Sequence, residues 1–324
     1  MDNKQKRNWC NKNTIGITHM NKSFFGCWPT MITSFTDDNK VDYKALKAIT
    51  DWYIDKGCDG IFAVCQSSEM FFLSEQEKID IAKAVLDAAA GRVKIIASGH
   101  TSDDQAKQIE ELGRMAETGV DAVVLVSNRL AKQDEDAGIL RDNFNAILKQ
   151  LPSVTFGMYE CPYPYLRLLS TDFIKECAAE KSLVFLKDVS CSAAIQKERV
   201  AAVRGTELAL FNANTATLLD SLLGGYMGFN GVMANFHVDI YKWLYSHFRE
   251  QPERAREVSD FLTVAAVCEA RAYPVSAKYH YDLTGVPMSI HTRSKDKSIL
   301  NENARLEVES LIRMETTMRR ILGL

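Results

Sequence analysis

Residues 93–126 read VKIIASGHTSDDQAKQIEELGRMAETGVDAVVLV, and the spacing of their apolar residues indicates a fold class. Two short apolar runs, 93–98 and 122–126, flank a segment, 102–118, in which apolar residues recur at helical spacing. Runs of consecutive apolar residues are typical of strands that are buried on both faces of a parallel sheet. Strand, helix and strand in this order predict one crossover unit of such a sheet.

The same unit recurs about eight times along the chain. Further helical spacing is found in residues 42–56, 74–90 and 136–149. The candidate strands are residues 25–32, 60–64, 93–98, 122–126, 154–158, 183–187, 208–211 and 229–233. Eight units without a glycine-rich dinucleotide fingerprint favour an α/β fold of the (β/α)8 TIM barrel type over an open doubly wound sheet.

The pattern divides the chain into three parts. Residues 1–20 are polar and lack the apolar core of a secretory signal, so we expect a disordered extension, of which residues 1–19 are dispensable for folding. Residues 21–235 are predicted to form the barrel. Helical patterns at 241–248, 255–272 and 303–322 predict a C-terminal helical extension over residues 236–324.

The composition limits the classes of function. With 46% hydrophobic residues, the 324-residue chain has enough apolar surface for a large core. Its 39 basic and 42 acidic residues are interspersed, which predicts a small-molecule partner rather than nucleic acid. No apolar run approaches the roughly 18 residues of a membrane span. Eight cysteines without closely spaced pairs predict free thiols and a cytoplasmic protein.

Polar residues follow several of the predicted strands. In TIM barrels the functional side chains lie at the C-terminal ends of the strands. Lys187 closes the apolar run 183–186, where a partly desolvated amine has a lowered pKa and can attack a carbonyl carbon. A lysine whose stem packs on the strand while its ammonium group reaches solvent has the same sequence pattern. The sequence therefore makes Lys187 a candidate nucleophile without excluding a structural role.

Other candidate residues lie at the same strand ends. Tyr159 ends the fifth strand and is either a proton donor or a core tyrosine. Ser67 and Ser68 follow the second strand, where their hydroxyls and backbone N–H groups could hold a carboxylate or simply form a turn. The remaining candidates for substrate binding are Gln66, Glu160 and Asn230.

Residues 24–295, approximately, resemble the dihydrodipicolinate synthase and N-acetylneuraminate lyase superfamily of class I aldolases. The segment Phe185-Leu186-Lys187-Asp188-Val189-Ser190 is similar to the family's Schiff-base lysine segment. Tyr159-Glu160-Cys161-Pro162 resembles its Tyr-Asn-x-Pro motif. Further similarities follow in the family's order: Gly26, Thr30, Thr33 and Phe35, then Leu73, Ser74, Glu77 and Lys78, then Gly224, Gly225, Gly228, Ala234, Asn235, Gly285 and Arg293.

The resemblance implies a chemistry and a partner. A 2-oxo acid, such as pyruvate or a 2-keto-3-deoxy sugar acid, would condense with Lys187, while Tyr159 transfers protons and Ser67 holds the carboxylate. The expected activity is that of a carbon–carbon or carbon–oxygen lyase. The resemblance further implies that no metal or organic cofactor is needed and that the protein is a homo-oligomer, a dimer or a tetramer.

Several positions depart from the family's pattern. The Gly-Thr-Thr-Gly-Glu turn is replaced by residues 65–69, in which Gln66 replaces the relay threonine. Since an amide does not pass on protons as a hydroxyl does, the relay is altered. The relay tyrosine aligns with Leu130 and the substrate-binding arginine with Pro164, while Arg167 is out of register. The departures argue against dihydrodipicolinate synthesis.

Three readings stay open. Tyr163, Tyr165 and Glu160 at the mouth suggest a sugar-acid or aromatic aldehyde as second substrate. The altered relay motivates a non-catalytic 2-oxo acid-binding or regulatory protein on the same barrel. Cys65, Cys161 and Cys191 motivate a thiol or metal site, although small cysteines are ordinary packing residues.

Overall fold

The computed structural model describes residues 24–324, so the predictions about residues 1–20 lie outside the described residues. Its strands form one parallel sheet in the order β1-β8-β7-β6-β5-β4-β3-β2, and a parallel bridge between Thr30 and Phe62 joins the two edges. The prediction of a (β/α)8 TIM barrel is confirmed. The strands are β1 (Gly26–Cys27), β2 (Gly60–Val64), β3 (Lys94–Ala97), β4 (Ala122–Val126), β5 (Phe156–Tyr159), β6 (Phe185–Asp188), β7 (Ala209–Asn212) and β8 (Gly228–Phe229).

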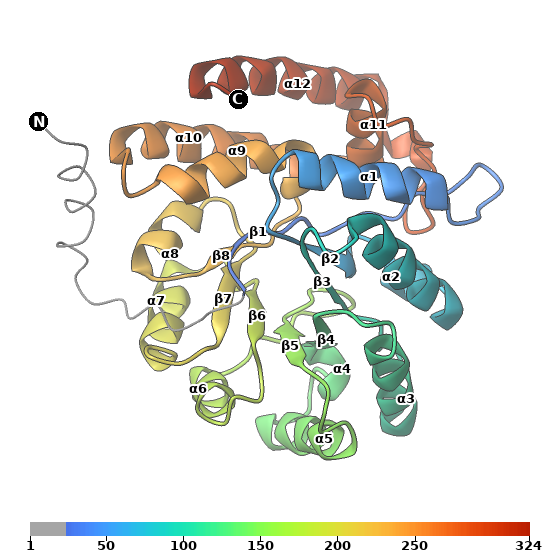
Figure 1. The fold of residues 1–324 in the computed structure, drawn as a ribbon, viewed down its shortest axis with the longest axis vertical. Coiled ribbons are helices and arrows are strands. Elements are labelled where there is room, and N and C mark those ends of the chain that lie inside the picture. Colours follow the sequence, from blue (N-terminus) through green and yellow to red (C-terminus); the bar gives the residue numbers. More distant parts are fainter. Residues whose placement is uncertain (1–23) are drawn as a thin grey trace, which may run out of the picture.

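Helices surround this sheet, as Figure 1 shows. Polar caps set their starts: Asp42 accepts from the N–H of Ala45, and Ser74 and Glu77 form a reciprocal capping box. The helices of the barrel are α1 (Tyr43–Asp55), α2 (Glu75–Ala89), α3 (Gln105–Ala116), α4 (Ser127–Leu130), α5 (Ala137–Gln150), α6 (Thr171–Ala179), α7 (Ala193–Ala202) and α8 (Leu218–Gly224), with a 3-10 turn, η1 (Met70–Phe72), after β2.

Aromatic side chains fill the barrel interior. The rings of Phe185 and Phe211 lie 4.8 Å apart, and Trp28 contacts both of them. Glycine makes room for this packing, since a Cβ atom at Gly60 would lie 2.4 Å from the Trp28 ring. Side chains two residues apart on a strand share a face, so Lys187 points into the barrel directly beyond Phe185. The aromatic layer thus excludes water from one side of Lys187.

The C-terminal part of the chain forms α9 (Ala234–His247), α10 (Pro252–Ala265), η2 (Ala266–Ala270), α11 (Val275–Leu283), η3 (Lys297–Ile299) and α12 (Glu302–Leu322). The helix expected over 255–272 is shorter, because it changes to a 3-10 turn at Ala266 and the backbone is extended at Arg271. None of the described helices is both long enough and apolar enough to cross a membrane.

A buried carboxylate fixes α12 to the rest of the molecule. Glu315 lies 2.9 Å from Nδ1 of His237 in α9 and 3.0 Å from Nε2 of His280 in α11. All three side chains are fully buried. Arg319 donates to the same carboxylate and to Asp239. These contacts hold α9, α11 and α12 together, and thereby define the position of η2, which lies between α10 and α11 in the chain.

Candidate active site

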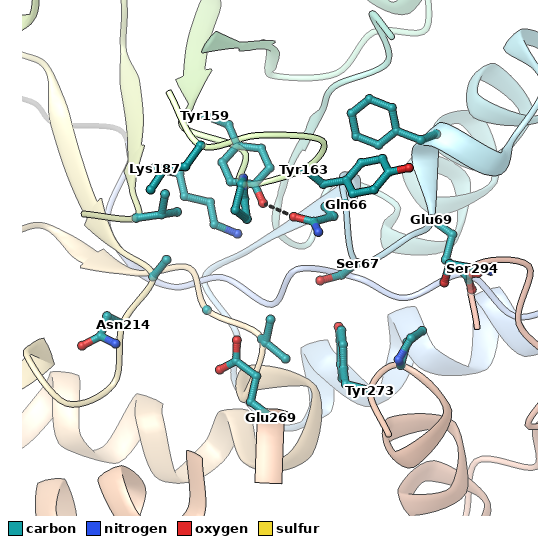
Figure 2. A pocket seen from close by; sticks show the side chains of 18 of the residues that line it. Gln66, Ser67, Glu69, Tyr159, Tyr163, Lys187, Asn214, Glu269, Tyr273 and Ser294 are labelled. Carbon is teal, nitrogen blue, oxygen red and sulfur yellow. Dashed lines mark hydrogen bonds between the residues drawn. The ribbon is translucent and has the colours of Figure 1, made fainter. Parts of the chain in front are cut away.

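A cavity of about 470 Å³ lies where the strands end. Figure 2 shows that its side chains come from distant parts of the sequence. The turn after β2, the ends of β5 and β6, the loop after β7 and the C-terminal extension all contribute. Its polar lining includes Gln66, Ser67, Glu69, Tyr159, Lys187, Asn214, Glu269, Tyr273, Ser294 and Lys295.

Lys187 lies on the inner wall of this cavity, near the end of β6. Its Nζ atom lies 4.5 Å from the centre of the Tyr159 ring and 5.8 Å from that of Phe62. Burial lowers the pKa of Lys187 to about 8, against the opposing effect of nearby negative groups. At neutral pH a useful fraction of the amine is therefore uncharged and nucleophilic.

Tyr159 pairs with Lys187 across the β5–β6 ladder. Its hydroxyl donates to Oε1 of Gln66 over 3.2 Å, as Figure 2 shows, and the Cys161 thiol lies 3.6 Å from the same oxygen. Burial raises the pKa of Tyr159 well above its usual value. The phenol therefore stays protonated, a proton donor next to the lysine.

The two serines of the turn after β2 have different surroundings. Ser67 lines the cavity, and its hydroxyl donates to Oγ1 of Thr30 over 3.1 Å. Ser68 is fully buried, donates to the carbonyl of Cys65 over 2.7 Å and accepts from the N–H of the same residue. Ser68 does not line the cavity, so its predicted contact with substrate is not supported by its position. It stabilises the turn that presents Ser67 and Gln66.

The expectation that Glu160 lies at the mouth of the site is wrong. Its side chain is fully buried and accepts from both terminal nitrogens of Arg199, at 2.9 and 2.6 Å. Asn230 is equally buried, and its amide donates to the carbonyl of Trp28 over 2.7 Å. Neither residue lines the cavity, because Glu160 is held by Arg199 and the Asn230 amide N–H by the Trp28 carbonyl inside the protein.

Glu160 and Arg199 belong to a buried ionic cluster that also contains Asp188. Nη1 of Arg199 lies 2.9 Å from Asp188, which also accepts a hydrogen bond from Tyr226. Glu160 directly follows Tyr159 in the chain, and Asp188 directly follows Lys187. The cluster therefore joins the ends of β5 and β6 at the point where both proposed reactive side chains emerge.

The model of the Dihydrodipicolinate synthetase family matches residues 23–315 of this sequence. The chain belongs to this family. A 4-hydroxy-tetrahydrodipicolinate synthase from Laribacter hongkongensis (strain HLHK9) is 27% identical over 296 residues, which cover 89% of this chain and 99% of that protein. At this identity the chain is a distant member.

Solved structures share the family's fold. YagE, a prophage protein of this family from E. coli K12 solved in complex with pyruvate, superposes with a TM-score of 0.82 at 21% identity, covering 90% of this chain and 99% of that one. CdNal from Clostridium difficile, solved in complex with mannosamine, gives a TM-score of 0.81 at 17% identity, covering 90% of this chain and 99% of that one.

The structure accounts for the departures from the family's pattern after β4 and β5. The Arg167 guanidinium donates to the carbonyls of Lys132, Glu135 and Asp136, and Arg167 does not line the cavity. Leu130 is fully buried in α4. Within residues 24–324, the cavity lining contains no arginine. Of the two expected aromatic rings, Tyr163 lines the cavity and contacts Phe71, whereas the hydroxyl of Tyr165 bonds to backbone carbonyls.

The three cysteines of the proposed thiol or metal site do not share one environment. Cys65 and Cys161 are buried, whereas Cys191 is exposed and lines the cavity. In the part of the chain that the structure describes, no three His, Cys, Asp or Glu side chains are arranged to hold a metal ion.

Sequence reasoning missed the contribution of the C-terminal extension. Glu269 at η2 and Tyr273 before α11 both face the cavity. Glu69 explains how this part of the chain is attached: its carboxylate accepts from the backbone N–H groups of Arg293, at 2.7 Å, and Ser294, at 2.6 Å. The family's turn glutamate could have indicated an anchoring role, but nothing in the sequence identified the anchored segment.

Proposed function

We propose that this protein is a class I aldolase-type lyase whose Lys187 forms a Schiff base with a 2-oxo acid, such as pyruvate or a 2-keto-3-deoxy sugar acid. The observation that carries this proposal is the buried amine of Lys187 on the cavity wall, with a pKa lowered to about 8. A phenol and a serine hydroxyl, those of Tyr159 and Ser67, line the same cavity. Family membership adds independent support.

The proposed reaction begins when the uncharged amine attacks the C2 carbonyl of the 2-oxo acid. Tyr159 passes two protons in turn to the C2 oxygen, one taken from the attacking nitrogen and one from solvent, so that the oxygen leaves as water, the phenol is again protonated and the protonated imine remains. Ser67 and its turn hold the carboxylate, which fixes C2 beside Nζ. The imine draws electrons from C3, so that a bond at C3 or between C3 and C4 can break.

The second substrate is proposed to differ from that of the dihydrodipicolinate synthases. The cavity lining offers no arginine among the described residues, and the relay threonine is Gln66. The aromatic side chains of Phe71 and Tyr163 line the mouth instead. These features fit a sugar-acid or aromatic aldehyde portion. The non-catalytic alternative is less favoured, because a binding protein has no need for a desolvated amine beside a proton donor.

Reductive trapping tests the proposal. The protein is incubated with pyruvate and with a panel of 2-keto-3-deoxy sugar acids, reduced with borohydride and mapped by peptide mass spectrometry, while product release is assayed in parallel. We expect an adduct on Lys187 that is lost in Lys187→Ala. Lys278 is an internal control, since burial also lowers its pKa to about 8 but it does not line the cavity. No adduct, or equal labelling of both lysines, contradicts the proposal.

The resemblance also implies a homo-oligomer in the cytoplasm, and both remain proposals. Light scattering coupled to size-exclusion chromatography measures the mass in solution against the 36.4 kDa of one chain. A mass of two or four chains is expected, and a monomer contradicts the oligomer proposal.

A further inference from the structure

The cavity lining contains two carboxylates, Glu69 and Glu269. They differ in what they already bind. Glu69 accepts from two backbone N–H groups and lies 3.4 Å from Nζ of the buried Lys278. Within residues 24–324, no hydrogen bond or ion pair engages the Glu269 carboxylate. Glu269 is therefore the carboxylate that is free to act on a molecule in the cavity.

Glu269 is placed to reach a substrate held on Lys187. It lies in η2, and its side chain is exposed to the cavity rather than packed in the core. Figure 2 shows its carboxylate pointing into the cavity on the side of Lys187, while Ser67 and Tyr159 lie on other parts of the wall. Lys187 and Glu269 each affect the pKa of the other through their charges, which agrees with positions on one cavity.

The other groups in the cavity are poor bases. The Tyr159 hydroxyl donates a hydrogen bond to Gln66, and burial raises the pKa of Tyr159 and Tyr273 well above their usual values. The pKa of the Cys191 thiol is also raised, chiefly by burial. Lys187 is consumed in the imine. Partial desolvation inside the cavity raises the pKa of Glu269, which brings a carboxyl group closer to neutrality, where acid–base catalysis is most efficient.

We infer that Glu269 is a catalytic acid–base residue that exchanges the C3 proton of the 2-oxo acid bound to Lys187; this inference rests on the proposed function. In this step the C3–H bond breaks and its proton goes to the Glu269 carboxylate. The electron pair forms the C2–C3 double bond, and the C2–N π pair moves to the imine nitrogen, which gives the neutral enamine. The reverse step returns the proton to C3. Carbon–carbon cleavage and dehydration each require either the removal or the return of the C3 proton.

The test follows exchange of the pyruvate methyl protons in D2O by proton NMR, because this exchange requires the enamine but no second substrate. Glu269→Gln removes the base and keeps the size of the side chain. We expect exchange to fall by about 10²–10⁴-fold, the range that general acid–base groups contribute. Glu269→Asp should restore part of the rate. Glu257→Gln, an exposed position in α10, is the matched control and should exchange like the unchanged protein.

Borohydride trapping on the same samples separates this inference from the proposed function. Glu269→Gln should still give the pyruvate adduct on Lys187, because the amine and the cavity remain. An adduct together with unchanged exchange overturns the role of Glu269. If Tyr159→Phe still gives the adduct but loses exchange, while Glu269→Gln keeps exchange, the base is Tyr159 and the inference is also overturned. No adduct in the unchanged protein refutes the proposed function itself.

A pD profile at saturating pyruvate distinguishes catalysis from a merely structural role. The titratable groups that share the cavity lining with Glu269 include Glu69, Lys187, Cys191, Tyr273 and Lys295. Tyr241 on α9 is buried outside this lining, where its hydroxyl bonds to Thr215. Exchange by the unchanged protein should fall on the acid side as the Glu269 carboxylate takes up a proton. Glu269→Gln should not show this decrease in exchange at low pD. If the decrease is retained in Glu269→Gln, another group causes it and the inference is overturned.

Discussion

The hydroxyl of Tyr159 donates its hydrogen bond to Oε1 of Gln66, 3.2 Å away. An amide oxygen accepts this bond but cannot take the proton and pass it on. Gln66 therefore fixes the direction of the phenol without forming a relay. A threonine hydroxyl at residue 66 would both orient Tyr159 and transfer protons. Gln66 keeps only the first of these two properties.

Gln66→Leu should lower turnover by about fivefold, because the phenol loses a hydrogen bond worth about 1 kcal/mol and with it a fixed direction. Gln66→Glu, which keeps an acceptor at this position, is the control and should retain more activity. Steady-state rates with the substrate found by trapping measure both variants. A rate for Gln66→Leu equal to that of the unchanged protein would show that Tyr159 needs no partner at residue 66.

The pKa of Lys187 predicts how imine formation depends on pH. Only the uncharged amine attacks the carbonyl, and the pKa of about 8 means that the uncharged fraction rises between pH 7 and pH 9 and then levels off. The initial rate of trapping with pyruvate should rise about tenfold over this interval. A rate that continues to rise up to pH 10.5, the usual pKa of lysine, contradicts the lowered pKa.

The same burial predicts that Lys187 destabilises the fold. Below pH 8 the unfolded chain and the folded protein both carry the charge, and the folded protein holds it in a dry site. The free-energy cost of the buried charge is therefore complete below pH 8. It disappears as the pH rises to about 10.5, because the unfolded chain then also loses its proton. Lys187→Met should therefore raise the free energy of unfolding by up to about 3 kcal/mol at pH 7.

Urea unfolding at pH 7 and near pH 10.5 measures this effect. The increase in the free energy of unfolding caused by Lys187→Met should be smaller at the higher pH. Lys83→Met, at an exposed position in α2, should change stability little at either pH. A Lys187→Met protein that is less stable than the unchanged protein at pH 7 would show that the amine has favourable partners.

The barrel could be predicted from the sequence because its strands are apolar on both faces. Strand β4 was predicted with its observed bounds, Ala122–Val126, since every residue in it is buried and Asp121 and Ser127 mark its ends. At β1 the prediction was too long. Residues 28–32 are apolar or buried because they pack near the barrel's closure, but only Gly26–Cys27 form a regular ladder.

Residues of the candidate site could be predicted only where the local sequence determines the direction in which a side chain points. Tyr159 and Lys187 close apolar strands, so the alternation of side chains points them into the barrel. Glu160 directly follows β5, but its partner Arg199 is 39 residues away and gave no local signal. Helix α11 was missed because its polar and aromatic residues interrupt the simple apolar spacing. Tyr279 and His280 bond to carboxylates of α12, and the ring of Tyr281 packs against α1.

Arg199 should be essential for stability. Arg199→Met leaves two buried carboxylates, Glu160 and Asp188, facing each other without a cation, which should cost about 3–5 kcal/mol in the free energy of unfolding. Arg256→Met removes an exposed ion pair with Asp220 and should cost less than about 1 kcal/mol. Urea unfolding compares the two variants. Similar small losses in both would mean that the ends of β5 and β6 tolerate Glu160 and Asp188 without the Arg199 cation.

Ser67 and Ser68 offer a matched pair for testing where the carboxylate of the substrate binds. Ser67→Ala removes a hydroxyl from the cavity, and a lost hydrogen bond to a charged group costs about 1.5–3 kcal/mol. The pyruvate concentration for half-maximal trapping should therefore rise about 10-fold to 100-fold. Ser68→Ala should leave that concentration unchanged and lower stability instead, because the Ser68 hydroxyl bonds to the backbone of Cys65 behind the turn. If both variants weaken pyruvate binding equally, the shape of the turn, rather than the Ser67 hydroxyl, holds the carboxylate.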